Sequence, residues 1–195
     1  MKSRNMRFFV LASAILCATW LMATTPIAHA TTLMHMSIAK MSQTAPLIVR
    51  ARCMGNATSW DAGNIWTFTS FSVEETWRGT APQEIIVRLL GGSVGSITSN
   101  VSGIPHFRLG EEVILFLEPT PRGDFSVVSW QQGTFRIHRD RVAGRETVTQ
   151  DTASFATIDP ATHQFQTAGV RNLPLDALRA QVDAALLNAS PGRKP

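Results

Sequence analysis

The chain has 195 residues, 44% of them hydrophobic, with 18 basic and 14 acidic side chains and a net charge of +4. This length and apolar content suit one domain with a substantial core. The basic residues are mostly single arginines spread along the chain, and nucleic-acid binding needs a clustered basic face. The composition therefore predicts no nucleic-acid partner.

The first thirty residues have the three parts of a secretory signal peptide. Three basic residues within the first seven precede the apolar run 8–22. The small residues Ala28 and Ala30 lie at the predicted cleavage site. The run has about 15 residues, too few for a transmembrane helix. We expect residues 1–30 to be removed, leaving a periplasmic or extracellular chain that begins at Thr31. That chain has fifteen basic and fourteen acidic residues, so it is close to neutral.

Cysteine usage supports a chain without a disulfide or a lipid anchor. Cys17 lies in the predicted leader and follows Leu16, whereas a lipoprotein site needs a small residue there. Only Cys53 remains in the mature chain, so no intramolecular disulfide is possible. Cys53 ends an apolar run without a neighbouring His or Lys, which is typical of a small buried side chain. We expect no stable membrane anchor.

Residues 31–45 form an N-terminal segment that allows a short helix. Four apolar residues support its helical spacing: Leu33, Met34, Ile38 and Met41. His35 and the flanking methionines Met34, Met36 and Met41 also suggest a copper site, because imidazole and thioether ligands suit that metal. Helical spacing and the lack of repeated Met-x-x-Met units favour a helix packed on the domain instead. We predict no metal and no other cofactor.

Residues 46–149 have the pattern of β-strands. The segment 47–53 alternates apolar and basic residues, and 65–77 is a long run rich in β-branched and aromatic residues that we expect to bend. Gly55–Asn56 is predicted to be a turn. Five consecutive apolar residues at 113–117 predict a central strand covered on both faces. Further strands are predicted at 84–90, 124–130, 133–139 and 141–149.

The C-terminal part is predicted to be an irregular linker, a helix and a tail. Residues 150–172 are polar without clear periodicity, and 173–189 form an amphipathic helix with Pro174 in its first turn. Its apolar stripe comprises Leu175, Leu178, Val182 and Leu186. Residues 190–195 are expected to be a disordered tail.

These elements predict a mainly β fold, a small antiparallel barrel with a C-terminal amphipathic helix and a short N-terminal one. Closing the sheet removes exposed strand edges. The segments 45–52, 73–79 and 110–117 resemble a group of uncharacterised secreted bacterial proteins. The strand order over about residues 45–137 resembles the oligonucleotide/oligosaccharide-binding (OB) barrel of netrin-like modules, including tissue inhibitors of metalloproteinases. The resemblance implies this fold. The inhibitors begin with a cysteine that chelates the protease zinc, and this chain has none, so their activity is not implied.

We find no catalytic or metal-binding motif. The mature histidines have no zinc-binding spacing, and Gly-x-Ser-x-Gly is absent. The pairs Glu74–Glu75 and Glu111–Glu112 are expected to be solvated, because neighbours on a strand point to opposite faces. The glycine-rich segment 91–96 has no following helix or lysine to hold a phosphate.

The sequence therefore predicts an exported, non-catalytic interaction module that binds a protein or peptide. The alternative is a barrel that binds a glycan or another small ligand through aromatic residues such as Trp66 and Phe68, and a secreted enzyme comes third. We expect the partner to contact the segment 91–107, since loops on a rigid barrel carry binding. The candidate contact residues are Gly91, Gly92, Ile97, Val101, Ile104 and Phe107.

Overall fold

The computed structural model of the chain describes most of the predicted mature part. The described residues are 33–140, 144–150, 152, 157–158, 162–166 and 169–189. The predicted leader, its exit at Ala28 and Ala30, and the predicted tail 190–195 lie outside them. No helix in the described part is long and apolar enough to cross a membrane.

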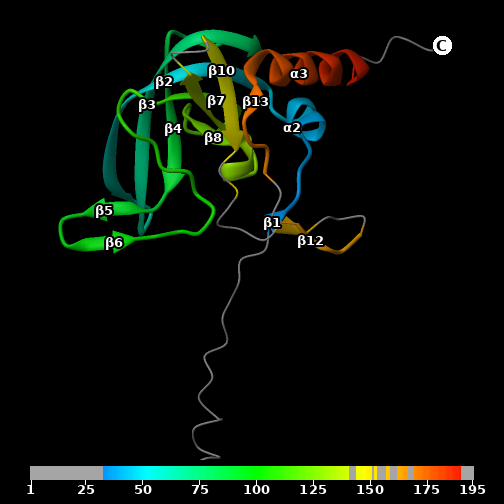
Figure 1. Cartoon of the computed structure of the whole chain (residues 1–195). Coiled ribbons are helices and arrows are strands. Elements are labelled where there is room, and N and C mark those ends of the chain that lie inside the picture. Colours follow the sequence, from blue (N-terminus) through cyan, green and yellow to red (C-terminus); the bar gives the residue numbers. More distant parts are fainter. Residues whose placement is uncertain are drawn as a thin grey trace, which may run out of the picture. The chain divides into compact units, whose positions relative to one another are not determined.

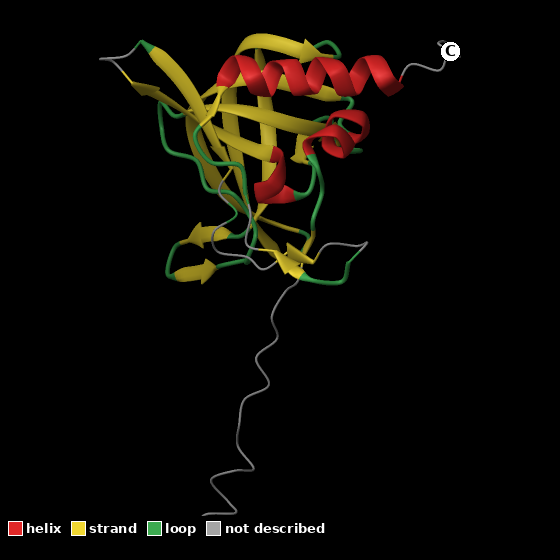
Figure 2. Cartoon of the chain, turned by 45° about the vertical axis from the view of Figure 1, so that its right-hand side comes forward, coloured by secondary structure: helices red, strands yellow, loops and turns green. Residues whose placement is uncertain are grey.

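Strands dominate the described chain (Figures 1 and 2). The strands are β1 (Leu33–Met34), β2 (Leu47–Asp61), β3 (Asn64–Arg78), β4 (Glu84–Leu90), β5 (Gly92–Val94), β6 (Ile97–Ser99), β7 (Glu112–Pro119), β8 (Phe125–Val127), β9 (Thr134–Asp140), β10 (Arg145–Gln150), β11 (Thr157–Ile158), β12 (Phe165–Gln166) and β13 (Leu173–Pro174). The helices are α2 (Ile38–Thr44), a short 3-10 helix (Trp130–Gly133) and α3 (Leu175–Ala189).

The main sheet has the order β13-β10-β9-β7-β2-β3-β4-β8, and β8 also pairs with β7. The strands β7, β2, β3, β4 and β8 therefore close into a ring. The pairings are antiparallel except for β4 with β8, which is parallel. The predicted mainly β, barrel-like fold with a C-terminal helix is confirmed.

The strands β2 and β3 form one long, bent hairpin. Its turn is Ala62–Gly63, where both residues have positive φ values (49° and 81°), the conformation of a two-residue hairpin turn. The prediction of a turn at Gly55–Asn56 is wrong. The pairing register shifts between Cys53 and Gly55, and this irregularity lets β2 continue past the glycine.

The inside of the ring is an apolar core. Alternate residues of each ring strand point inward, as predicted for 47–53, and Cys53 is buried there. Phe71 from β3 packs edge-to-face on Phe107, with ring centroids 5.0 Å apart.

A second apolar layer lies on the outer face of the sheet, under α2 and α3. The strand β7 contributes to both cores: Val113, Leu115 and Leu117 face the ring, and Ile114 and Phe116 face the helices. The prediction that 113–117 is covered on both faces is confirmed. Figure 2 shows the two helices next to each other on this side of the sheet.

Both predicted helices form. The Ser37 hydroxyl caps α2 by accepting a bond from the Lys40 N–H at 3.2 Å, and Met41 is buried beneath the helix. In α3, Leu178 and Val182 are buried as predicted. The helix begins at Leu175 and not at residue 173, because Leu173–Pro174 pairs with β10.

The described parts of the segment 150–172 are less irregular than predicted. Gln150 ends β10 and is buried, and its backbone N–H donates to the Val170 carbonyl at 2.8 Å. Farther along, β11 pairs with β1 and β12. Backbone pairing of this kind leaves no hydrophobic periodicity, so it gives no signal in the sequence.

Candidate functional site

The segment 91–107 begins with a small hairpin, β5–β6, fixed closely to the β2–β3 hairpin. The Gly91 N–H donates to the Ile65 carbonyl at 2.8 Å. A Cβ atom at Gly92 would lie 2.5 Å from Thr67 Oγ1 and 2.8 Å from a methyl carbon of Thr58, so only glycine fits there. The two glycines therefore set the close approach of the hairpins and present no side chain to a partner.

Three later residues of the segment complete the ring core. Ile104 and Phe107 are buried in it, and Val101 packs against it. This corrects the expectation that Ile104 and Phe107 contact a partner, because both side chains are buried. Their spacing has no period because the chain here is an irregular loop and not a strand.

Of the six candidate residues, Ile97 is the large apolar one at the surface. Its side chain is about half exposed, as is that of Trp60 near the tip of the β2–β3 hairpin. The two hairpins meet where the Thr58 hydroxyl donates to the Ser93 carbonyl at 2.5 Å. Figure 1 shows β5 and β6 beside this end of β2 and β3. The structure therefore places two exposed apolar side chains on two joined hairpins.

The aromatic residues on the outer face of β3 are covered. The Arg88 guanidinium lies 4.8 Å from the centre of the Trp66 ring and 5.0 Å from that of Phe68. Asp61 and Asp124 each hold this guanidinium at 2.9 Å. A sugar cannot stack on the ring surfaces that Arg88 already occupies.

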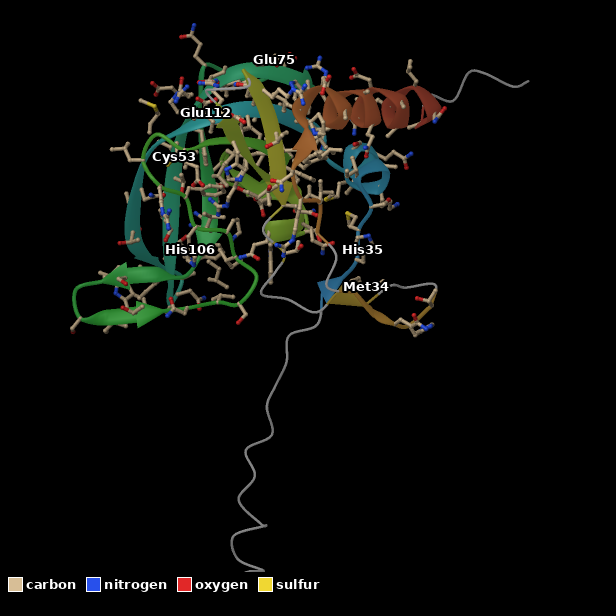
Figure 3. The ribbon with its side chains drawn as sticks, in the orientation of Figure 1. Met34, His35, Cys53, Glu75, His106 and Glu112 are labelled. Carbon is tan, nitrogen blue, oxygen red and sulfur yellow. The ribbon has the colours of Figure 1, made fainter. Side chains whose placement is uncertain are left out.

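Acidic residues predicted to be solvated take part in a network of ion pairs. We call this set the charge network: Arg50, Arg52, Glu74, Glu112, Arg139 and Glu146. Glu112, with only 10% of its side chain exposed, pairs with Arg50 at 3.0 Å, Arg52 at 2.6 Å and Arg139 at 2.9 Å. Glu146 pairs with Arg50 at 2.9 Å and with Arg139 at 2.6 Å. The expectation of solvated carboxylates is therefore wrong for Glu112, which Figure 3 labels.

The network shifts the pKa values of its members. Hydrogen bonds from Arg50 and Arg139 lower the pKa of Glu146 below its ordinary value. Burial alone would raise the pKa of Glu112, but hydrogen bonds from Arg50 and Arg52 outweigh it and lower the pKa. The same contacts, above all that with Glu146, raise the pKa of Arg50. These groups are held in their charged forms, which suits a structural role and not proton transfer near neutral pH.

The other two acidic residues of the predicted pairs have separate partners. Glu111 pairs with Arg136, and its carboxylate also accepts the Arg108 N–H at 3.0 Å. Glu75 pairs with Arg179 of α3 at 2.6 Å. Sequence reasoning missed these contacts because each one joins elements distant in the chain.

The described residues contain no group of three or more His, Cys, Asp or Glu side chains placed to hold a metal ion. Burial raises the pKa of the Cys53 thiol, which makes it less reactive. Met41 fills the layer under α2, the packing role favoured over copper binding, while Met34 is exposed.

Comparison with known proteins assigns no family. No family model matches the chain, and the search of curated proteins finds no similar sequence. The netrin-like resemblance therefore stays a prediction from the sequence.

Proposed function

We propose that the protein is an exported, non-catalytic binding module that recognises a protein or peptide partner through the β2–β3 and β5–β6 hairpin tips. The observation that carries this proposal is the pair of half-exposed side chains, Trp60 and Ile97, on the joined hairpins. Aromatic and aliphatic side chains are frequent anchors at protein interfaces.

The contacts that hold the two hairpins together favour binding of a partner. Gly92 fits tightly against Thr58 and Thr67, and the Thr58–Ser93 bond ties the two hairpins together. A surface that is already ordered loses little conformational entropy when a partner binds. An apolar protein or peptide side chain suits Trp60 and Ile97 better than a glycan does, and Arg88 covers the aromatic residues that a glycan would use.

Export is the first part of the proposal to test. N-terminal sequencing of the protein recovered outside the cytoplasm should begin at Thr31. A recovered chain that retains Met1, or one acylated at Cys17, would contradict the predicted cleavage.

Recognition is tested by crosslinking. A photoreactive amino acid placed at Ile97 should capture a defined partner in cells, and W60S in the same chain should remove that capture. The matched control places the photoreactive group at Met54, which is equally exposed but lies on β2 away from the hairpin tips.

The thermal melt of each variant should stay close to that of the unchanged chain, because both side chains are exposed. Equal capture from positions 97 and 54, or capture that survives W60S, would assign the partner to another surface. The point substitutions are preferable to deletion of residues 96–102, because that deletion would also remove β6 and Val101, which packs on the core.

A further inference from the structure

A cleft of about 810 Å³ lies at the other end of β3 from the hairpin tips. Its walls come from the last residues of β3, the facing ends of β9 and β10, and the first turn of α3. Its volume falls within the range of sites for small ligands, roughly 300–1,000 Å³. Glu75, at the rim of this cleft, is labelled in Figure 3.

Trp77 supplies a buried donor at the wall of the cleft. Its side chain is only 9% exposed, and the indole Nε1 has no hydrogen-bond partner among the described residues. The nitrogen lies close enough to Glu75 to help lower the pKa of that carboxyl, yet without the geometry of a hydrogen bond. Arg179 covers the ring at 4.9 Å from its centre. A buried N–H without a well-placed acceptor is costly, so a ligand acceptor in the cleft would stabilise this one.

Arg145 supplies a charge that is not paired with any other residue in the described part of the chain. Two acid–base pairs at the cleft are already formed, Glu146 with Arg139 and Glu75 with Arg179. Arg145, on β10, lines the same cleft and is exposed, and it forms no ion pair with another described residue. A guanidinium binds a carboxylate through two parallel hydrogen bonds, so Arg145 is suited to an anionic group.

The remaining acidic residues of the cleft, Asp176 and Asp140, form no ion pair with Arg145 among the contacts of the described residues. The Asp176 carboxylate accepts the Ala177 N–H at 2.9 Å, and Asp140 lies opposite Arg145 in the pairing of β9 with β10. Leu175 and Pro174 add apolar surface beside Trp77. The cleft thus combines one available cation, one buried N–H donor, one carboxylate acceptor at Glu75 and an apolar wall.

We propose that this cleft binds the terminal unit of an acylated amino acid, either a free N-acyl amino acid or the carboxyl end of a peptide. Arg145 takes the carboxylate, the Trp77 N–H donates to the acyl oxygen, and Glu75 accepts the amide N–H. The side chain of the ligand packs on Leu175 and Pro174. This site lies apart from the hairpin tips and goes beyond the function proposed above.

The test uses N-acetyl-leucine as the probe and N-acetyl-leucinamide, which lacks the charge, as its matched control. Calorimetric titration into the purified full chain should give saturable binding of the acid and much weaker binding of the amide. In ¹H–¹⁵N spectra, the Trp77 indole signal, assigned by its loss in W77F, should move as the acid is added.

Three variants locate the site. R145A should weaken binding about tenfold or more, because it removes a charge-assisted hydrogen bond. W77F keeps most of the apolar ring surface but lacks the N–H, and it should also weaken binding. R108A removes an exposed arginine that does not line the cleft, and it should bind like the unchanged chain.

Equal affinity for acid and amide, no saturable binding of the acid, or unchanged affinity in R145A would overturn the proposal. A comparison with N-acetyl-glycyl-glycyl-leucine separates the two sources: comparable or tighter binding assigns peptide ends, and weaker binding assigns free acyl amino acids. The variant W60S should bind N-acetyl-leucine normally, so failure at the hairpin tips and failure at the cleft are distinguishable.

Discussion

The outer face of the main sheet has two halves built on the same strands. One half is apolar and lies under α2 and α3, and its residues are Ile48, Ile114, Phe116, Phe135 and Val148. The other half is the charge network, which lies farther along the same strands. Its members there are Arg50 on β2, Glu112 on β7, Arg139 on β9 and Glu146 on β10. In both halves the outward positions alternate with residues that face the opposite side of the sheet.

The difference shows that alternation along a strand does not by itself define the environment of its outward positions. Ile48 and Arg50 are successive outward residues of β2, yet one is covered by a helix layer and the other by paired charges. On β7, Phe116 and Glu112 show the same change. Where no helix covers the sheet, its outward positions carry paired arginine and glutamate side chains.

The largest effect is expected in the helix-covered half. Phe116→Ala should lower the free energy of unfolding by about 3–5 kcal/mol, because Phe116 is fully buried beneath the helices. Chemical denaturation measures the loss, and hydrogen exchange should show faster exchange in α2 and α3. The matched variant Leu115→Ala, on the ring side of the same strand, should cost about 2–5 kcal/mol and affect the ring first. Identical exchange patterns would mean that the two cores do not respond separately.

In the charged half, Arg50→Ala should destabilise by about 2–3 kcal/mol, below the cost of breaking a fully buried pair. Its side chain is 15% exposed, and its removal leaves Glu112 and Glu146 close together without their shared cation. Arg52→Ala is the control, because Arg52 is more exposed and should cost only about 1 kcal/mol. Equal losses in denaturant titrations would show that the network has no central member.

Acid should weaken the charged half. The pKa values of Glu112 and Glu146 are lower in the folded chain than their ordinary value of 4.5, so the unfolded chain binds more protons as the pH falls. Their contribution to stability is complete above about pH 5 and is lost as the pH falls through their folded pKa values. Melting temperatures should therefore fall on acidification, and E146Q should fall less steeply than the unchanged chain. A parallel fall in both would place the acid sensitivity elsewhere.

The smallest effect is expected at Arg122, which belongs to neither half. Arg122→Ala should cost about 0.5 kcal/mol or less, because its pair with Asp61 is exposed to solvent. Asp61 also keeps its bond to Arg88 at 2.9 Å. A loss in thermal denaturation comparable to that of Arg50→Ala would contradict the distinction between exposed and half-buried arginines.

Patterns confined to one element could be predicted from the sequence. The apolar run 113–117 indicated a strand buried on both faces, and the stripe containing Leu178 and Val182 indicated the C-terminal helix. Each of these signals is complete within a few consecutive residues.

Features that depend on the pairing of distant segments could not be predicted. The charge network joins Arg50, Glu112 and Glu146 across nearly a hundred residues, and only the strand register brings them together. Ile104 and Phe107 lie in the core although their loop has no periodicity. The cleft at Trp77 likewise depends on where α3 begins beside β10, which required the unexpected pairing of Leu173–Pro174.

The strand β8 closes the ring with unequal pairing on its two sides, and this difference sets where the barrel opens first. In the described chain, β8 meets β7 through three paired residues but meets β4 only through Val87 and Phe125. Next to that single bridge, Arg88 of β4 binds Asp124, the residue before β8. This side-chain ion pair thus holds β4 and β8 together where their backbone pairing is shortest. Local opening of the barrel should therefore begin between β4 and β8. The strength of the Arg88–Asp124 ion pair should set how often this opening exposes the interior to water.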